Sequence, residues 1–415
     1  FPSRIPTAMP ILPSLLTMLV PLVAQVPSPP ADALKTVAER TEYKATARHA
    51  DVVALCKALA GTSPNARYME LGRSAEGRPL PLLILADPPV ESAAEATADG
   101  RLVVLAIGAI HGGEVCGKEA LPMLARELLG VPHHPILKNL IIALAPVFNA
   151  DGNERTAKSN RPGQVGPEQG VGERTNARGL DLNRDFIKLE APETRALVRF
   201  FNEWNPHLFI DTHTTNGSHH RYAITYEGPR NPAGDGGVID YARSRFLPAL
   251  NAAFEKSTGL QAYYYGDFDA DHSHWNSFPA EGRFGTNYFG LRNRLSLLSE
   301  AYSYAPYKTR VLATRDFVRE ALNTASAHKD EIVKVLDDAV RKTVQAGESP
   351  RDDDRVPLRS EPGYLNGAEP IQGYVEKDGG IRDYPAEVMN EFHAVETVAR
   401  PFAYLIPAAC ERAVA

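Results

Sequence analysis

The stretch over residues 101–130, RLVVLAIGAIHGGEVCGKEALPMLARELLG, constrains the fold of this chain most strongly. Residues 102–107 form an apolar run with β-branched side chains, which predicts a fully buried strand. Apolar residues then recur at helical spacing over residues 115–129, which predicts a helix directly after the strand. The connection between them is His111, Gly112, Gly113 and Glu114. The chain thus places polar side chains in a tight turn between a strand and a helix.

His111 and Glu114 are expected to point the same way, because a His in the turn and a Glu in the first helical turn share one side of the helix. An imidazole and a carboxylate so placed reach one metal ion, which is half of a zinc site. The spacing also arises often by chance. The alternative is a turn His followed by a Glu that interacts favourably with the dipole of the helix N-terminus.

A second histidine follows another predicted strand. Residues 208–210 are a short apolar run, and Asp211, Thr212 and His213 come directly after it. In a parallel α/β sheet, ligands gather just outside the carboxyl ends of the strands, where both histidines would lie. His111, Glu114 and His213 would leave one coordination position open for water, which is typical of a catalytic zinc. The alternative for His213 is a loop histidine with no metal role.

Composition limits the kind of protein. The chain has 415 residues, of which 43% are hydrophobic and 23% charged, so one large α/β domain with appendages is favoured over several small domains. A formal net charge of -6 disfavours nucleic acid or an anionic membrane as the main partner. Cys56, Cys116 and Cys410 are too few for a disulfide framework or a cysteine-based zinc site.

Three regions are predicted along the chain. Residues 1–30 resemble a secretory signal, with an apolar segment after Arg4 and cleavage near Ala24, which indicates export; a disordered apolar tail is the alternative. Three prolines interrupt the apolar segment, so it is not a membrane span. Residues 41–342 form the predicted catalytic domain. After a linker over residues 345–355, residues 356–415 are expected to form a small β-rich region, which is interpreted as truncated at its C-terminal end.

Local patterns predict the remaining elements. Helices are expected at 50–59, 192–203, 237–254 and 307–340, and one begins at 408–415. A hairpin is expected over 68–85, and strands at 140–147, 295–299, 373–375, 392–398 and 401–406. Residues 158–179 form a long loop, and residues 263–293 are irregular; loops of such length in a compact domain are usually functional.

Two polar clusters receive plain interpretations. Residues 267–274 carry three Asp and two His but lack the spacing of a calcium loop, so a second cation site is disfavoured. His219 and His220 are interpreted as a polar loop at the rim of the cleft, and His133 and His134 as a surface connection.

A fourth polar group joins the series at the end of the strand over residues 295–299. Glu300 follows this apolar run, and a carboxylate at the end of a buried strand needs a role; a capping or ion-paired Glu is the alternative. The ordered set of motifs resembles the zinc metallopeptidases of the carboxypeptidase A type, and a Gly-containing turn at residues 72–78 is similar to one in bacterial members. The motifs are His111-x-x-Glu114, Asp181-Leu182-Asn183-Arg184, Asp211-Thr212-His213 and Ser299-Glu300.

The resemblance implies an α/β fold with a central mixed, mostly parallel sheet, helices on both of its faces, and a small β-rich C-terminal segment. It implies one zinc ion per chain, held by His111, Glu114 and His213, with Asp181 orienting His111. Glu300 would be the general base toward a zinc-activated water. An Arg would stabilise the oxyanion, with Arg174 as first candidate and Arg161 as second.

Asn183 and Arg184 are similar to the pair that holds the substrate's terminal carboxylate in this family. The alternative for Arg184 is an ion pair with Asp185 or Glu190. The tyrosine that many members use has no clear counterpart; Tyr288 is the nearest candidate, although a packed aromatic is favoured there. The residue that sets side-chain preference is not identified.

The resemblance predicts a metallocarboxypeptidase that hydrolyses C-terminal peptide bonds, with a peptide or protein C-terminus as its partner and an exported location. It leaves the substrate class and the oligomeric state open. Two alternatives remain. One is a zinc-dependent N-deacylase of the desuccinylase and aspartoacylase type, which has a similar motif. The other is a metal-free binding module derived from a peptidase.

Overall fold

The computed structural model describes residues 31–407, apart from residues 216, 352, 366, 368–369 and 375–378. The signal-like segment and its predicted cleavage point lie outside the described residues, as do Cys410 and the helix expected at 408–415. Cys56 and Cys116 are buried free thiols. Among the described residues, no helix combines the length and the apolar composition that crossing a bilayer requires.

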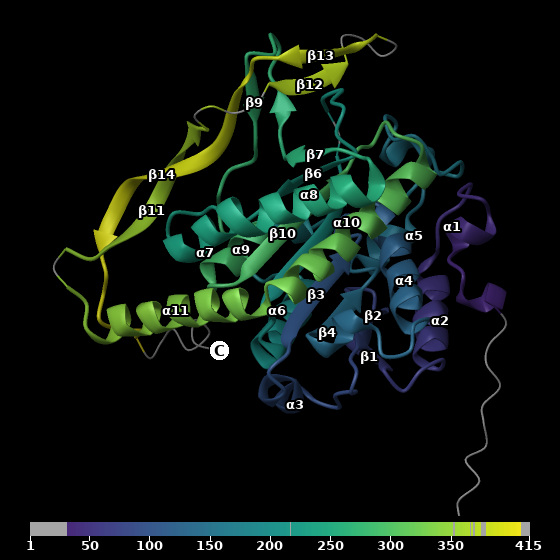
Figure 1. Cartoon of the computed structure of the whole chain (residues 1–415), viewed down its shortest axis with the longest axis horizontal. Coiled ribbons are helices and arrows are strands. Elements are labelled where there is room, and N and C mark those ends of the chain that lie inside the picture. Colours follow the sequence, from purple (N-terminus) through teal and green to yellow (C-terminus); the bar gives the residue numbers. More distant parts are fainter. Residues whose placement is uncertain are drawn as a thin grey trace, which may run out of the picture.

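An eight-stranded mixed sheet forms the centre of the molecule (Figure 1). Its four central strands are parallel to one another. The strands β1, β2 and β6 are each antiparallel to the adjacent strand that lies nearer the centre of the sheet. The predicted α/β fold with a mostly parallel sheet is confirmed. In spatial order the strands are β1 (Ala66–Arg73), β2 (Pro79–Leu85), β4 (Leu140–Ala145), β3 (Leu102–Gly108), β5 (Leu208–Thr214), β10 (Leu295–Ala301), β6 (Ile224–Glu227) and β7 (Ala262–Tyr264).

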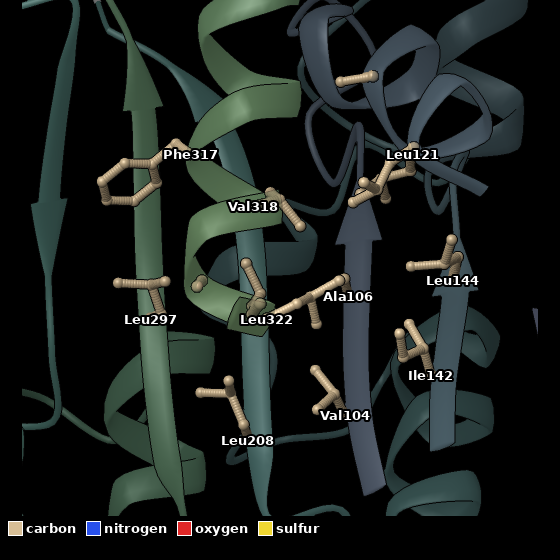
Figure 2. Packing of buried hydrophobic residues seen from close by; sticks show 14 of the residues in the cluster. Val104, Ala106, Leu121, Ile142, Leu144, Leu208, Leu297, Phe317, Val318 and Leu322 are labelled. Carbon is tan, nitrogen blue, oxygen red and sulfur yellow. The ribbon is translucent and has the colours of Figure 1, made fainter. Parts of the chain in front are cut away.

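Helices cover both faces of the sheet, and β3 shows why its sequence is apolar throughout. Side chains alternate between the faces of a strand, so a strand covered on both sides needs apolar residues at every position. Val104 and Ala106 pack in the core on one face, and Val103 and Leu105 in the core on the other. Figure 2 shows the first of these cores, where Val104 and Ala106 face helix α10 (Tyr307–Ala327).

The helices of these two layers come from many parts of the chain. The face in Figure 2 is covered by α2 (His49–Ala60), α4 (Cys116–Leu129), α8 (Leu247–Thr258) and α10 (Tyr307–Ala327). The opposite face is covered by α3 (Ala93–Ala98), α6 (Pro192–Trp204) and α9 (Gly285–Leu291). Short helical segments lie elsewhere, at α1 (Val37–Arg40), α5 (Ala150–Glu154), η1 (Ala31–Leu34), η2 (Pro135–Lys138), η3 (Lys158–Asn160) and η4 (Leu182–Arg184).

Three predicted elements differ in the structure. The helix expected at 237–254 is divided into α7 (Gly236–Tyr241), a π-helical turn η5 (Ala242–Phe246) and α8. Pro248 in the first turn of α8 lacks a backbone N–H, which favours a changed hydrogen-bond pattern before it. The helix expected at 307–340 is two helices, α10 and α11 (Lys329–Glu348), separated by His328. The irregular region 263–293 contains β7, β8 (Asp267–Phe268), β9 (His274–Asn276) and α9.

The C-terminal region is rich in strands, as predicted. A long antiparallel pair, β11 (Arg355–Tyr364) and β14 (Glu387–Ala399), forms an arm that leaves the end of α11 (Figure 1). A small hairpin joins β12 (Ile371–Tyr374) to β13 (Ile381–Tyr384). The strand predicted at 401–406 is wrong, because this segment is irregular and exposed. The arm is not isolated, since β14 pairs with β9 and joins β8 and β9 in one four-stranded sheet.

Candidate metal centre and active site

Three neighbouring strands deliver the polar side chains to one edge of the sheet. His213 lies on β5 and pairs in register with Glu300 on β10, and His111 follows the end of β3, which pairs with β5 on its other side. The turn after β3 has no room for a side chain at Gly112. A Cβ added at Gly112 would lie 2.5 Å from the carbonyl carbon of Gly152. The close approach of these two backbone segments therefore requires glycine at residue 112.

His111, Glu114 and His213 form a compact buried cluster, as the sequence predicted. The Nδ1 atoms of the two histidines lie 2.9 Å and 2.7 Å from the two carboxylate oxygens of Glu114. All three side chains offer ligand atoms within 4.8 Å of one another, and each residue is only 3% exposed. Two nitrogens and one carboxylate thus lie close together and border one cavity.

The charges around Glu114 favour its ionised form. Burial opposes ionisation most strongly, but Arg161, His111 and His213 together hold the pKa of Glu114 well below its usual range. Arg161 makes an ion pair with the Oε1 of Glu114 and donates a hydrogen bond to Thr214 O at 3.3 Å. The backbone N–H of Thr214 donates to Glu114 Oε2 at 3.2 Å. The carboxylate is therefore ready to act as an anionic ligand.

Each histidine is oriented from behind by an aspartate. Asp181 Oδ1 lies 3.1 Å from His111 Nε2, and Asp211 Oδ2 lies 2.8 Å from His213 Nε2. A carboxylate at Nε2 fixes the proton there and leaves Nδ1 with a free lone pair directed at the cluster. The prediction had assigned this role to Asp181 only. Asp211 was missed, although it stands two residues before His213 on a strand and so points to the same face.

The residues present fit zinc. Two imidazole nitrogens and one carboxylate are the donor set of catalytic zinc sites, which keep a further position for water or substrate. Both histidines have an aspartate behind them, as metal-ligating histidines require for a fixed ring orientation. His111, Glu114 and His213 would hold the ion.

Neutralising the two aspartates is expected to weaken zinc binding without abolishing it. Asp181→Asn and Asp211→Asn each remove the charge that favours the ligating form of a histidine, so zinc affinity should fall about 10–100-fold. Competition with a fluorescent chelator measures this fall. Asp87→Asn is a matched control, because Asp87 contacts the exposed His133 at 2.8 Å and belongs to neither the cluster nor the cavity lining. Unchanged affinity in both site variants would contradict the orienting role.

Both candidate arginines reach Glu114 Oε1, Arg161 in a close ion pair and Arg174 at 3.8 Å. Arg161 is only 12% exposed and is committed to Glu114, whereas Arg174 is 41% exposed and lines the open cavity. Arg174 Nη1 lies 3.4 Å from His111 Nδ1, and its Nε donates to Asp181 Oδ2 at 2.8 Å. The long predicted loop is held in place here because Asn149 Nδ2 donates to Arg174 O at 3.0 Å.

Asn183 and Arg184 lie on the other side of the cluster. Asn183 Nδ2 is 3.5 Å from His213 Nε2, and its Oδ1 accepts from the N–H of Gly285 at 2.9 Å. Arg184 donates to Asn183 O at 2.7 Å and stacks over the ring of Phe284 at 4.2 Å. Within the described part of the chain, Arg184 forms no ion pair. Burial lowers the pKa of its guanidinium, and the negative charge of Asp181 opposes this effect only in part.

The ion pair considered for Arg184 as an alternative is absent, because its expected partners are occupied elsewhere. The carboxylate of Asp185 accepts from the backbone N–H groups of Glu190 and Ala191, both at 2.9 Å. Glu190 lies 3.9 Å from Lys188. The guanidinium of Arg184 is therefore available to an anion that enters the cavity.

Glu300 borders the cavity beside these groups. Burial, with a smaller opposing effect of His213, raises the pKa of Glu300 to about 8. A carboxylate with a raised pKa accepts and returns a proton near neutral pH, as a general base requires. Tyr265 also lines the cavity, and burial together with Glu300 raises its pKa well above the usual range. Tyr288 packs instead against Phe186, with ring centroids 5.5 Å apart, so the packed aromatic favoured for it is present.

The cavity that these residues enclose has a volume of about 260 Å³. Phe278 and Phe284 are aromatic residues of its wall, and Thr286 and Leu298 also line it. Sequence reasoning missed these four residues and Tyr265. Most of them come from the region 263–293. This region has no hydrophobic periodicity that distinguishes buried from exposed positions, so the sequence alone does not indicate that these residues line one cavity.

The other polar clusters do not line the cavity. His220 is 1% exposed and packs between Tyr302 and Trp275, so its interpretation as a polar rim residue is wrong. Burial lowers its pKa to about 3. Asp269, Asp271 and His274, from the Asp-rich stretch, place possible ligand atoms within 4.8 Å of one another, and Asp269 Oδ2 lies 2.7 Å from His274 Nδ1.

Comparison with known proteins agrees with this geometry. The sequence model of the family described as zinc carboxypeptidase matches residues 52–278, which is more than half of the chain. Carboxypeptidase 2 of Trichophyton tonsurans is 23% identical over 356 residues, which cover 81% of this chain and 61% of the relative. Carboxypeptidase D of mouse is 37% identical over 166 residues, covering 34% of this chain and 12% of the relative.

The chain thus spans less than two thirds of the length of both relatives. A solved metallo-carboxypeptidase from Pseudomonas aeruginosa, in complex with (2-guanidinoethylmercapto)succinic acid, is 20% identical and has a TM-score of 0.49 over 68% of each chain. The family match covers the segment that carries His111, Glu114, Asp181, Arg184 and His213. On the match over residues 52–278, this chain belongs to the zinc carboxypeptidase family.

Proposed function

We propose that the protein is a zinc-dependent metallocarboxypeptidase that releases the C-terminal residue of a peptide. The observation that carries this proposal is the position of Arg184. Its guanidinium is free of ion pairs among the described residues, lies in the wall of the cavity, and shares that cavity with the three metal-binding side chains. A free α-carboxylate is the group that such a guanidinium binds in a bidentate manner. Cleavage would then occur one residue from the chain end.

The residues around the cavity divide the work of hydrolysis. Zinc, when bound, polarises a carbonyl group and lowers the pKa of a water molecule. Glu300 accepts the proton of the attacking water and returns it to the leaving amine nitrogen. Arg174, exposed to the cavity and close to His111, stabilises the negative charge that develops on the carbonyl oxygen. Arg161 remains with Glu114 and keeps that ligand ionised. Among the two candidates, Arg174 is therefore the oxyanion arginine.

Substrate binding falls to a second set of residues. Asn183 and Arg184 hold the terminal carboxylate, and this contact places the scissile carbonyl next to the metal-binding cluster. The hydroxyl of Tyr265, which lines the cavity, donates a hydrogen bond to the peptide. This role replaces the one considered for Tyr288.

Removing the carboxylate clamp is expected to abolish discrimination between chain ends. Wild type should cleave a peptide with a free C-terminal carboxylate and leave the matching C-terminal amide nearly untouched. Arg184→Ala should lose about 10²-fold in kcat/KM on the acid, since a charged contact worth about 2–3 kcal/mol is gone, and should treat acid and amide alike. Initial rates on the peptide pair measure both effects.

Arg283→Ala is the matched control for Arg184→Ala. Arg283 also lies near the ring of Phe284, at 5.2 Å, but it makes an ion pair with Glu281 at 2.5 Å and does not line the cavity. Its replacement should keep the preference for the acid. Equal cleavage of acid and amide by wild type would contradict the carboxypeptidase proposal and favour an endopeptidase or the N-deacylase.

The location and the domain division remain proposals as well. We infer export, as the signal-like sequence at residues 1–30 supports, and we assign the activity to residues 41–342, with residues 356–415 as an appended β-rich region. Cell fractionation of the full protein, with the mass of the mature chain, tests the export proposal. A mature chain that begins near residue 25 in the exported fraction is the expected result.

A further inference from the structure

The arm formed by β11 and β14 is connected to the cavity through one buried arginine. Arg230 follows β6 and is only 3% exposed. Its Nη1 donates to Glu227 Oε2 at 3.0 Å, to Ser277 Oγ at 2.7 Å and to Asn390 Oδ1 at 3.1 Å. Asn390 belongs to β14 and is 2% exposed. The arm thus supplies a buried acceptor to a charged group of the central domain.

Arg230 in turn supports a residue of the cavity wall. Its Nη2 donates to the carbonyl oxygen of Phe278 at 2.6 Å, and its guanidinium lies 4.1 Å from the centroid of the Phe278 ring. The ring of Phe392, on β14, lies on the same guanidinium at 5.0 Å. A planar cation in contact with two rings is restrained, because a shift away from either ring weakens that contact. Phe392 and Asn390 therefore restrict the position of Phe278 without touching the cavity.

Phe278 occupies the middle of the aromatic wall. Its ring lies 5.6 Å from that of Tyr265 and 5.0 Å from that of Phe284, and Phe284 lies under Arg184. A shift of Phe278 would change the space beside the carboxylate clamp. This is the space into which the side chain of the C-terminal residue projects when its carboxylate is bound at Arg184.

The lining of this space indicates the class of side chain it accepts. Phe278, Phe284 and Leu298 are apolar and Thr286 is uncharged, whereas the carboxylates of the cavity, Glu114 and Glu300, belong to the metal-binding cluster and to the base. A basic side chain would therefore find no acidic partner of its own in the wall. An apolar side chain would bury its surface against the aromatic rings.

We propose that strand β14 fixes the wall of the pocket for an apolar C-terminal side chain, by holding Arg230 against Phe278. The inference rests on the proposed carboxypeptidase function and deepens it, because it gives the C-terminal arm a part in substrate selection. Asn390 and Phe392 are positioning residues in this account, and they touch neither the substrate nor the metal-binding cluster.

The test compares two substrates on variants of Phe392 in the full-length zinc-loaded protein. The substrates are N-acylated dipeptides that end in Phe or in Ala, each as free acid. Phe392→Ala should raise KM about fivefold for the Phe substrate, as the loss of one cation–π contact implies, and change KM for the Ala substrate less than twofold. The value of kcat should stay within about twofold, because the catalytic groups do not move. Phe392→Tyr keeps the ring and should restore the wild-type ratio of the two KM values.

Two comparisons exclude a general loss of stability. Val395→Ala removes an exposed side chain of the same strand, 45% accessible, and should leave both KM values unchanged. If Phe392→Ala does not fold, Asn390→Ala decides the question by the same KM ratio, since it removes an acceptor of Arg230 and keeps the ring.

The outcomes separate this inference from the proposed function. If wild type cleaves both acids and the variants change both KM values equally or not at all, the role of β14 is overturned, whereas the proposed carboxypeptidase function stands. Wild type that cleaves neither acid overturns both. A KM increase confined to the Phe substrate and reversed in Phe392→Tyr supports the inference.

Discussion

Replacement of Glu300 by Gln is expected to lower kcat by about 10²–10⁴-fold while zinc stays bound. The amide has nearly the shape of the carboxylate but does not accept a proton, so the attacking water keeps its proton and the leaving amine receives none. Glu300 is not one of the three clustered ligands, and hence zinc content should remain near one per chain. Single-turnover rates and metal analysis on the same preparation give both quantities.

Glu281→Gln is the control for this variant, because it makes the same chemical change on the surface, where Glu281 pairs with Arg283. Its kcat should equal that of wild type. Activity of Glu300→Gln within about tenfold of wild type would be more than the loss of a general base permits, and another residue would then have to serve as base.

Replacement of His213 by Ala is expected to remove zinc and activity together. The imidazole provides one of the three ligand atoms in the buried cluster, and its loss leaves two ligands at a site that needs three. Catalysis should fall below detection, since both carbonyl polarisation and water activation depend on the ion. The melting temperature with added zinc should no longer rise above that measured with a chelator, because ligand-linked stabilisation is lost.

His133→Ala is the matched control for the metal prediction. His133 is an exposed histidine, and among the described residues its ion-pair partner is Asp87. It should keep about one zinc per chain and full activity. Full zinc retention in His213→Ala would show that the ion is held elsewhere and would refute the assignment of the cluster.

Much of the fold was predictable because its main signals are local. The apolar run of β3 and the helical spacing of α4 identify a strand and a helix directly, and both lie where predicted. The order of His111, Glu114 and His213 after buried strands also predicted that they meet, because parallel strands bring their carboxyl ends to one edge. The positions of Asn183 and Arg184 followed only from the resemblance of the motif.

The features that sequence reasoning missed depend on contacts between distant segments. Phe278 has no local signal of a cavity wall, and its place depends on Arg230 and on β14, which is more than one hundred residues further along the chain. The edge strand β11 contains Pro357 and Pro362, which argue against a strand when only the sequence is considered. Asp211 is the exception, because the alternation of side chains on β5 was sufficient to place it beside His213.

The carboxypeptidase proposal is tested most directly by measuring the position at which zinc-loaded wild-type protein cuts a peptide. Incubation of a blocked peptide of defined sequence as free acid and as C-terminal amide, followed by mass analysis over time, gives the cut site without any variant. We expect release of a single residue from the C-terminus of the acid, no release from the amide, and loss of both zinc and activity on chelation. Cleavage at internal bonds, removal of the N-acyl group, or equal release from the amide would contradict the carboxypeptidase proposal.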